Sequence, residues 1–216
     1  MKFNDTFSST GQPATKAMYI AFEGMDRCGK TTQVRILAER IGAAVTREPG
    51  GQTALGAAIR QLVLQTDSDI TPRCEALLFA ADRAQHAHEF LRPTLNKGQH
   101  VISDRSLWSG AVYQGAARGL GVDAIVDLNY WATEGLVPDV VVWLDGGFNL
   151  HERDGQLDRI ESQTSEFHNT AAAAFAELAE QHNWLRVDAT GTIDEVATAV
   201  AEAVAPFFDA MLEVAQ

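Results

Sequence analysis

The sequence has few cysteines and no long apolar run. Its 2 cysteines, Cys28 and Cys74, are too few for a disulfide framework or a structural zinc site, so we expect a reduced, cytoplasmic setting. No apolar stretch approaches the roughly 18 residues that a membrane-spanning helix needs, so no membrane association is expected. Residues 1–16 lack the apolar centre of a signal peptide and are predicted to form a flexible N-terminal tail.

Basic residues are also scarce, and most of them lie in the first part of the chain. The formal net charge of −12 argues against a nucleic-acid partner. Residues 1–120 hold 14 of the 17 Lys and Arg residues, whereas residues 121–216 hold 18 of the 29 acidic residues. This distribution predicts a small anionic substrate, bound in a local positive pocket formed by the N-terminal part.

Short apolar runs alternate with longer helical segments, which is typical of an α/β fold with a parallel sheet. Strands are predicted at 18–24, 43–48, 100–104, 139–145 and 184–189. Helices are predicted at 30–42, 53–65, 74–95, 106–135, 164–182 and 193–213. In the last helix an apolar face is formed by residues at three- and four-residue spacing, namely Val196, Val200, Val204 and Phe207. We find no repeat and no linker, so one domain is expected.

The segment FEGMDRCGKTTQ, residues 22–33, contains the pattern G-x-x-x-x-G-K-[ST] between a predicted strand and a predicted helix. Backbone N–H groups of such a loop, together with the helix dipole, surround phosphate oxygens. Lys30 is expected to reach the β- and γ-phosphates of ATP, and the Thr31 hydroxyl to ligate Mg²⁺ near Asp104. The other residues expected to surround ATP are Gly24, Met25, Asp26, Arg27, Cys28, Gly29 and Thr32.

Two charges inside this loop, Asp26 and Arg27, favour a kinase over a nucleotide hydrolase. Arg27 is placed to lie over the phosphates and to stabilise charge on the transferred group. Asp26 would repel ATP if it faced the phosphates, so it is expected to face a hydroxyl of a second ligand. The alternative is an exposed Asp26–Arg27 ion pair of little energetic weight.

Taken together, the motifs resemble those of the thymidylate kinases, a family of P-loop nucleoside monophosphate kinases. The resemblance runs from about residue 18 to residue 205, and the motifs occur in the family's order. They are FEGMDRCGKTTQ (22–33), TREPGG (46–51), LLFAADRAQH (77–86), DRSLWSGAVYQG (104–115) and PDVVVWLD (138–145). The resemblance implies a P-loop sandwich with a five-stranded parallel sheet in the order 2-3-1-4-5 and helices on both faces.

The resemblance also implies an activity. It implies one kinase domain over residues 17–216, with a short lid around 146–163. This domain would transfer the γ-phosphoryl group of ATP to dTMP, with Mg²⁺ as cofactor. It further implies a homodimer, for which helices 72–96 and 106–118 are the candidate interface.

Several acceptor contacts follow from the same resemblance. Asp26 would contact the deoxyribose 3′-hydroxyl, while Arg27 would assist phosphoryl transfer. Phe79 and Arg83 lie four residues apart, and so on one helical face. An aromatic ring that stacks on a pyrimidine and a forked donor for its O4 suit thymine recognition.

The remaining implied contacts lie in two other motifs. Arg105 would hold the acceptor 5′-phosphate, a task that suits a guanidinium. Tyr113 would close the deoxyribose side, and Gln114 would lie close to the sugar or the base. Glu48 has two open interpretations, because it would either order water bound to Mg²⁺ or stabilise a turn through a salt bridge.

Two features depart from the family's pattern. Ser106 stands where the family usually has a tyrosine, and this change is expected to loosen the acceptor site. The lid is short, and it carries Arg153 as a candidate catalytic residue and Arg159 as a candidate ATP contact. A modified deoxypyrimidine monophosphate or a thymidine-like nucleoside therefore stays open as the acceptor. A P-loop NTPase without a small-molecule acceptor is the third hypothesis.

Overall fold

The structure is a computed structural model, which describes residues 17–65, 69–146 and 157–214. The tail predicted at 1–16 and residues 147–156 of the predicted lid, which include Arg153, lie outside these ranges. Among the helices in the described ranges, none is long and apolar enough to cross a membrane.

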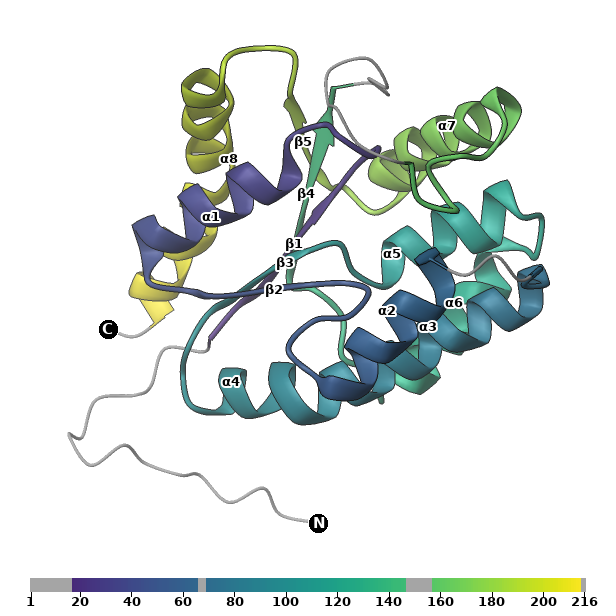
Figure 1. The fold of residues 1–216 in the computed structure, drawn as a ribbon. Coiled ribbons are helices and arrows are strands. Elements are labelled where there is room, and N and C mark those ends of the chain that lie inside the picture. Colours follow the sequence, from purple (N-terminus) through teal and green to yellow (C-terminus); the bar gives the residue numbers. More distant parts are fainter. Residues whose placement is uncertain (1–16, 66–68, 147–156, 215–216) are drawn as a thin grey trace.

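A five-stranded parallel sheet forms the centre of the molecule (Figure 1). Its strands are β1 (Tyr19–Glu23), β2 (Ala44–Arg47), β3 (Val101–Asp104), β4 (Val140–Asp145) and β5 (Leu185–Asp188). They lie in the order β2-β3-β1-β4-β5, and every neighbouring pair is parallel. The predicted fold class and strand order are confirmed.

Helices cover both faces of this sheet (Figure 1). On one face lie α1 (Lys30–Ile41) and α8 (Ile193–Val214), and on the other lies α7 (Ser165–Gln181). The remaining helical segments lie on the α7 side, with α2 packed on α3. They are α2 (Ala54–Gln65), α3 (Pro72–His86), η1 (Ala87–Leu91), α4 (Arg92–Asn96), α5 (Leu107–Gly110), η2 (Ala111–Ala117) and α6 (Val122–Ala132), of which η1 and η2 are π-helical.

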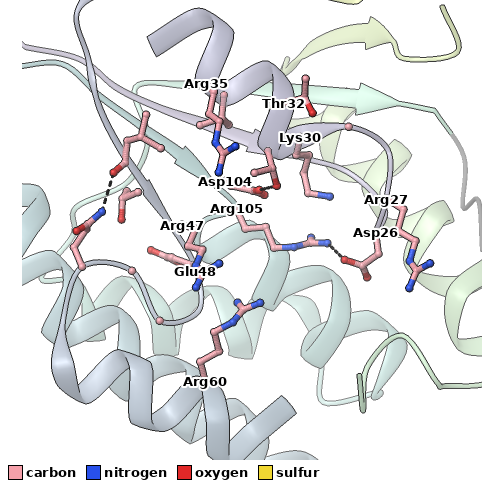
Figure 2. A pocket seen from close by; sticks show the side chains of 18 of the residues that line it. Asp26, Arg27, Lys30, Thr32, Arg35, Arg47, Glu48, Arg60, Asp104 and Arg105 are labelled. Carbon is pink, nitrogen blue, oxygen red and sulfur yellow. Dashed lines mark hydrogen bonds and ion pairs between the residues drawn. The ribbon is translucent and has the colours of Figure 1, made fainter. Parts of the chain in front are cut away.

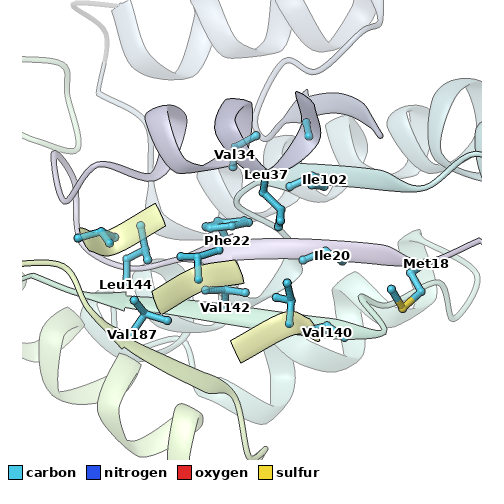
Figure 3. Packing of buried hydrophobic residues seen from close by; sticks show 14 residues of the cluster. Met18, Ile20, Phe22, Val34, Leu37, Ile102, Val140, Val142, Leu144 and Val187 are labelled. Atoms are coloured by element: carbon cyan, nitrogen blue, oxygen red, sulfur yellow. The ribbon is translucent and has the colours of Figure 1, made fainter. Parts of the chain in front are cut away.

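The alternation of side chains along β4 divides the core between the two faces. Val142 and Leu144 belong to the cluster beneath α1 and α8 (Figure 3). Val141 and Trp143 face the other side, where they belong to the cluster that contains Phe175 of α7. Successive strand residues point to opposite faces, so an unbroken apolar run indicates a parallel strand that is covered on both faces.

The helix predicted at 74–95 is longer than expected and contains a π-helical turn. Thr71 caps its start through its side-chain oxygen. At η1 the Arg92 N–H donates to the carbonyl of Ala87, five residues earlier. This turn therefore contains one residue more than a regular α-helical turn. It lies immediately before Pro93, which has no N–H and whose ring would clash within a regular helical turn.

The region predicted to be helical over 106–135 is helical, but it is interrupted once. The chain forms α5 and η2, turns, and begins again as α6. The turn contains Gly119 at φ 71° and Gly121 at φ 92°, values outside the right-handed helical region. Because the segment is split, η2 can pack on α7 while α6 packs on α3.

The predicted apolar face of the last helix is correct at three of its four positions. Val196, Val200 and Val204 are buried in the cluster beneath α1 and α8. Phe207 is 39% exposed, so the prediction for this residue is wrong. Phe208, at the next four-residue step, packs against the cluster instead.

Candidate active site

Two adjoining cavities open at the carboxyl ends of β1, β2 and β3. The larger has a volume of about 520 Å³ and the smaller about 100 Å³. Both are lined by Asp26, Glu48, Arg60, Arg105 and Asp158. Open α/β sheets bind ligands at this edge. Two ligands can therefore lie side by side, separated only by the residues that the cavities share.

The phosphate-binding loop of residues 24–31, the P-loop, holds the Lys30 ammonium at its centre. Lys30 Nζ donates to the carbonyl oxygens of Met25 at 2.7 Å and of Gly24 at 3.2 Å, and the residue is buried. Gly24 has φ 140°, and a Cβ there would lie 2.6 Å from the carbonyl oxygen of Leu144. Glycine is therefore required where the loop leaves β1, and the loop keeps a buried positive charge where a phosphate would bind.

Thr31 and Asp104 meet beside this loop. The Thr31 Oγ1 donates to Asp104 Oδ2 at 2.5 Å, and β3 places Asp104 next to Phe22 of β1. A hydroxyl and a carboxylate are the hard oxygen ligands that Mg²⁺ uses, together with phosphates and waters. In the described ranges, no group of three or more His, Cys, Asp or Glu side chains could hold a metal ion. The pair therefore fits a Mg²⁺ ion that also takes ligands from a bound nucleotide.

Asp26 lies between the two cavities, where Arg105 and Tyr113 contact it. Arg105 Nη2 forms an ion pair with Asp26 Oδ1, and Tyr113 Oη donates to Asp26 Oδ2 at 3.2 Å. The other terminal nitrogen of Arg105, Nη1, donates to Ser109 Oγ at 2.9 Å and to the Gly24 carbonyl at 3.2 Å. The Arg105 guanidinium is thus held at the shared wall through both of its terminal nitrogens, and Figure 2 shows its contact with Asp26.

The charges around Asp26 keep it ionised. Burial opposes ionisation, but Arg105 and Lys30 outweigh it and hold the pKa of the Asp26 carboxyl below its usual value. Burial raises the pKa of Tyr113, so its hydroxyl stays protonated and donates. The exposed Asp26–Arg27 pair considered as an alternative is not what forms, because Asp26 pairs with Arg105.

Arg27 lines the larger cavity and is held by Glu161, which lies in the described part of the predicted lid, residues 157–163. Its Nε and Nη2 donate to the two carboxylate oxygens of Glu161 at 3.2 and 3.4 Å. This hydrogen-bonded pairing raises the pKa of Arg27. Glu161 is itself fixed, because Oε2 also accepts the backbone N–H of Asp158 at 3.2 Å. The predicted contact between Arg27 and the transferred phosphoryl group stays a prediction.

Glu48 and Arg83 form a buried ion pair beneath the smaller cavity. Arg83 Nε donates to Glu48 Oε2 at 2.7 Å, while Arg83 Nη1 donates to Asn129 Oδ1 at 2.8 Å. The other oxygen of Glu48 lies 3.2 Å from His86 Nδ1. Burial opposes ionisation of Glu48, but Arg83 and His86 outweigh it and lower the pKa. Glu48 had two interpretations, and the contacts in the structure are those expected of the salt bridge.

The predicted base-binding residues converge on the smaller cavity. Phe79, Arg83, Tyr113 and Gln114 all line it, although they come from α3 and η2. Gly110 leaves room for this arrangement, because a Cβ there would lie 3.2 Å from Arg83 Nη1. The cavity therefore combines an aromatic ring with donors and acceptors at its edge.

Arg159, which was predicted to contact ATP, lies away from the P-loop. Its Nε donates to the Val63 carbonyl at 2.7 Å, and its Nη2 pairs with Glu75. Arg159 lines neither cavity, so the predicted contact with ATP is not found. A buried carboxylate on α3 attracts this guanidinium more strongly than the open cavity does, since burial strengthens the attraction between charges.

Sequence reasoning missed Arg60 and gave Arg47 no role. Arg60 lines both cavities and donates to the Pro49 carbonyl at 2.9 Å. Arg47, Arg60 and Arg105 all line the larger cavity (Figure 2), and burial together with the charges of Arg47 and Arg105 lowers the pKa of Arg60. A signal was present, because Arg60 is the only charged residue in the predicted helix 53–65.

Three other predicted features have structural explanations. Ser106 caps α5 and donates to Glu23 Oε1 at 2.8 Å, so it faces the core and lines neither cavity. The expectation that the absence of a tyrosine here loosens the acceptor site stays a prediction. Met25 is buried in the cluster that contains Phe175, and Cys28 packs against the cluster beneath α1 and α8. Neither residue lines either of the two cavities.

Comparisons with known proteins agree with this geometry. The family model for thymidylate kinase matches residues 22–200. A thymidylate kinase from Leifsonia xyli subsp. xyli is 44% identical over 195 residues, which cover 85% of this chain and 92% of the relative. A thymidylate kinase from Bifidobacterium longum (strain DJO10A) is 46% identical over 196 residues, covering 85% and 95%.

A solved structure shares the fold. The thymidylate kinase from Ehrlichia chaffeensis superposes with a TM-score of 0.74 at 26% identity, covering 87% of this chain and 98% of that one. The family model spans most of the chain, and the matched segment contains the P-loop, Asp104 and both cavities. The chain therefore belongs to the thymidylate kinase family.

Proposed function

We propose that this protein transfers the γ-phosphoryl group of ATP to dTMP, giving dTDP and ADP, in one direct in-line step. The observation that carries this proposal is the wall shared by the two cavities. Asp26 and Arg105 separate a P-loop cavity of about 520 Å³ from a smaller pocket of about 100 Å³. An enzyme that hydrolysed ATP would have no use for the second pocket beside the loop.

On the donor side, Lys30 would move from the loop carbonyls to the β- and γ-phosphates. Thr31 and Asp104 would hold Mg²⁺, which neutralises charge on the phosphate oxygens when it is bound. Arg27 lines the same cavity and would stabilise the charge that develops on the transferred group. Glu161 limits where the Arg27 guanidinium can point, so the arginine is partly oriented before the substrates bind.

On the acceptor side, three guanidinium groups support a phosphate site. Burial lowers the pKa of Arg60, and repulsion from the charges of Arg47 and Arg105 lowers it further. A phosphate dianion between them would remove this repulsion and accept several charge-assisted hydrogen bonds. The cluster therefore favours a nucleoside monophosphate over an uncharged nucleoside as the acceptor.

The smaller cavity suits the deoxyribose and the base. Phe79 would stack on the pyrimidine, and Arg83 would donate to O4 through Nη2, which makes no hydrogen bond to any described residue. Asp26 would accept from the 3′-hydroxyl. Tyr113 is buried against Asp26 and would leave little room for a 2′-hydroxyl.

We further propose that the protein acts as a homodimer in the cytoplasm. Three adjoining helices expose large apolar side chains, namely Leu62 on α2, Leu77 on α3 and Trp131 on α6. Exposed apolar side chains on adjoining helices favour a protein interface there. Of the predicted interface segments, 106–118 is unsuitable, because residues 106, 107 and 109–115 are buried within the subunit. Two free thiols, Cys28 and Cys74, are consistent with a reducing compartment.

One assay tests the activity. ADP release is measured with ATP and Mg²⁺ against dTMP, dUMP, dCMP, dGMP and thymidine, and the phosphorylated product is identified by mass. We expect dTMP to give the highest kcat/KM, with dTDP as product. ADP release that does not depend on an acceptor would indicate a nucleotide hydrolase, and a preference for thymidine would indicate a nucleoside kinase. Either result would refute the proposal.

A further inference from the structure

Glu75 is a fully buried carboxylate that three residues contact from two separate segments. It accepts from Gln114 Nε2 at 2.8 Å and from Arg118 Nε and Nη2 at 3.3 and 3.1 Å. It also forms an ion pair with Arg159 Nη2. Two guanidinium groups compensate the cost of burying this charge. An ionised carboxylate accepts hydrogen bonds but donates none, and this property constrains its neighbours.

The constraint falls on the side-chain amide of Gln114. A glutamine amide donates through its nitrogen and accepts through its oxygen, and rotation by half a turn exchanges the two. With Glu75 in place, that rotation would set Gln114 Oε1 against a carboxylate oxygen, so the amide nitrogen must face Glu75. Gln114 lines the smaller cavity, and its Oε1 accepts no hydrogen bond from any described residue.

Arg83 presents the complementary group in the same cavity. Its Nε and Nη1 are engaged by Glu48 and Asn129, and Nη2 is left to donate. The cavity therefore offers one donor, at Arg83, and one acceptor, at Gln114. A 4-keto pyrimidine, with O4 as acceptor and N3–H as donor, matches both. A 4-amino pyrimidine, with a donor at N4 and an acceptor at N3, matches neither.

We infer that Glu75 is a positioning residue that sets the choice of a keto over an amino pyrimidine by fixing the Gln114 amide. This inference rests on the proposed function, because it assumes that the base occupies the smaller cavity. Glu75 lines neither cavity, so it acts through Gln114 without contacting the substrate. One mismatched hydrogen bond at such a site changes relative rates about tenfold.

The test compares dTMP with 5-methyl-dCMP, which differs from dTMP only at the 4-amino group and N3. The measured quantity is the ratio of the two kcat/KM values. In Glu75→Gln the new amide can donate to Gln114 Oε1, so the Gln114 amide can turn its nitrogen toward N3 of the 4-amino base. We expect the preference for dTMP to fall about tenfold. Some preference should persist, because Arg83 still disfavours the 4-amino group.

Arg118→Lys is the matched control. It removes the hydrogen bonds that the Arg118 fork makes to Glu75 but leaves the carboxylate that orients Gln114. We expect its preference for dTMP to equal that of the wild type, whatever happens to its stability. An equal loss of preference in Arg118→Lys and Glu75→Gln would indicate general loosening of the pocket and would overturn the inference.

A double-mutant cycle tests whether Glu75 acts through Gln114. In a Gln114→Met background, adding Glu75→Gln should leave the preference for dTMP unchanged, because the amide is gone. A further tenfold loss there would contradict the inference. If Glu75→Gln does not give folded protein by circular dichroism, Glu75→Asp replaces it, since the shorter side chain withdraws the acceptor from Gln114. An unchanged preference in folded Glu75→Asp would also contradict the inference.

The wild-type measurement separates the two proposals. A wild-type protein that does not phosphorylate dTMP would refute the proposed function itself. A wild-type protein that phosphorylates dTMP, with the same preference as Glu75→Gln, would refute only the positioning role of Glu75.

Discussion

At the scale of single residues, the candidate site consists of charges that are already paired before any ligand is considered. Asp26 is paired with Arg105, Arg27 with Glu161, and Lys30 with carbonyls of its own loop. Binding a nucleotide would exchange some of these contacts for contacts to phosphate. Substitutions should therefore separate residues that act on the transferred group from residues that build the pocket.

Arg27→Ala tests the first kind of residue. Removing a guanidinium that stabilises the transferred phosphoryl group should lower kcat on the order of 10³-fold while the KM for dTMP changes little. Steady-state kinetics with dTMP as the varied substrate measures both constants. A variant with normal kcat and a raised KM for dTMP would contradict the role assigned to Arg27.

Glu48→Gln tests a residue that builds the pocket. The substitution keeps the shape of the side chain but removes the charge that compensates buried Arg83. Breaking a buried ion pair costs about 3 kcal/mol of unfolding free energy, because one charge stays buried without its partner. Urea unfolding measures this loss. The KM for dTMP should rise as well. An unchanged free energy of unfolding would show that Glu48 and Arg83 do not form the buried ion pair described above.

Which residues could be predicted depended on how local their contacts are. The P-loop residues were predictable because strand, loop and helix follow one another within 22–33. The pairing of Asp26 with Arg105 spans 79 positions of the chain and has no local pattern. Glu75 was missed for the same reason, since its partners lie 39 to 84 residues away.

At the scale of helices and strands, local sequence patterns predicted where the helices and strands lie but not where the helices are interrupted. The interruption of the predicted helical region 106–135 occurs at Gly119 and Gly121, which the spacing of apolar residues does not reveal. The π-helical turn before Pro93 lies within a helix whose apolar spacing stays continuous. These irregularities matter for the site, because η2 carries both Tyr113 and Gln114.

The start of β1 provides a test of pH dependence. His100 Nδ1 accepts the backbone N–H of Met18 at 3.0 Å, and burial lowers the pKa of His100. The folded protein therefore resists protonating this ring more than the unfolded chain does. The stability that His100 contributes is present above its ordinary pKa of about 6.5 and is lost as the pH falls below it.

Thermal unfolding at pH 7.5 and pH 5.5 checks this expectation. The melting temperature of the wild type should fall more over this interval than that of His100→Asn, which has no titrating ring. Equal falls in the two proteins would show that His100 does not contribute to the pH dependence.

At the scale of the whole molecule, the charge distribution along the chain correctly predicted that the N-terminal part forms a cavity lined by basic side chains. The basic side chains of the larger cavity come from the first 120 residues, and they are Arg27, Lys30, Arg35, Arg47, Arg60 and Arg105. The sheet order was predictable from the resemblance. The proposed subunit interface was predicted only in part, because Leu77 lies in the predicted segment 72–96 whereas Leu62 and Trp131 lie outside both predicted segments.

Trp131→Glu tests the proposed dimer face. Trp131 is 80% exposed, so the substitution should leave the subunit folded. A charge placed in an apolar interface should convert a dimer into monomers, and sedimentation velocity measures the change. Phe207→Glu is the control, because it alters an exposed aromatic residue on α8, away from that face. Dissociation by the control but not by Trp131→Glu would place the interface elsewhere.

The end of β3 has a consequence for how such sequences can change in length. Asp104 lines only the larger cavity and the next residue, Arg105, lines both, so one peptide bond joins the carboxylate beside the P-loop to the guanidinium at the shared wall. Inserting one residue there would shift the two groups by about 3.3 Å. Reacting atoms must approach within about 3–3.5 Å, so such a shift would prevent transfer. Insertions and deletions among functional relatives should therefore be excluded from this junction, while the loops farther from it stay free to vary.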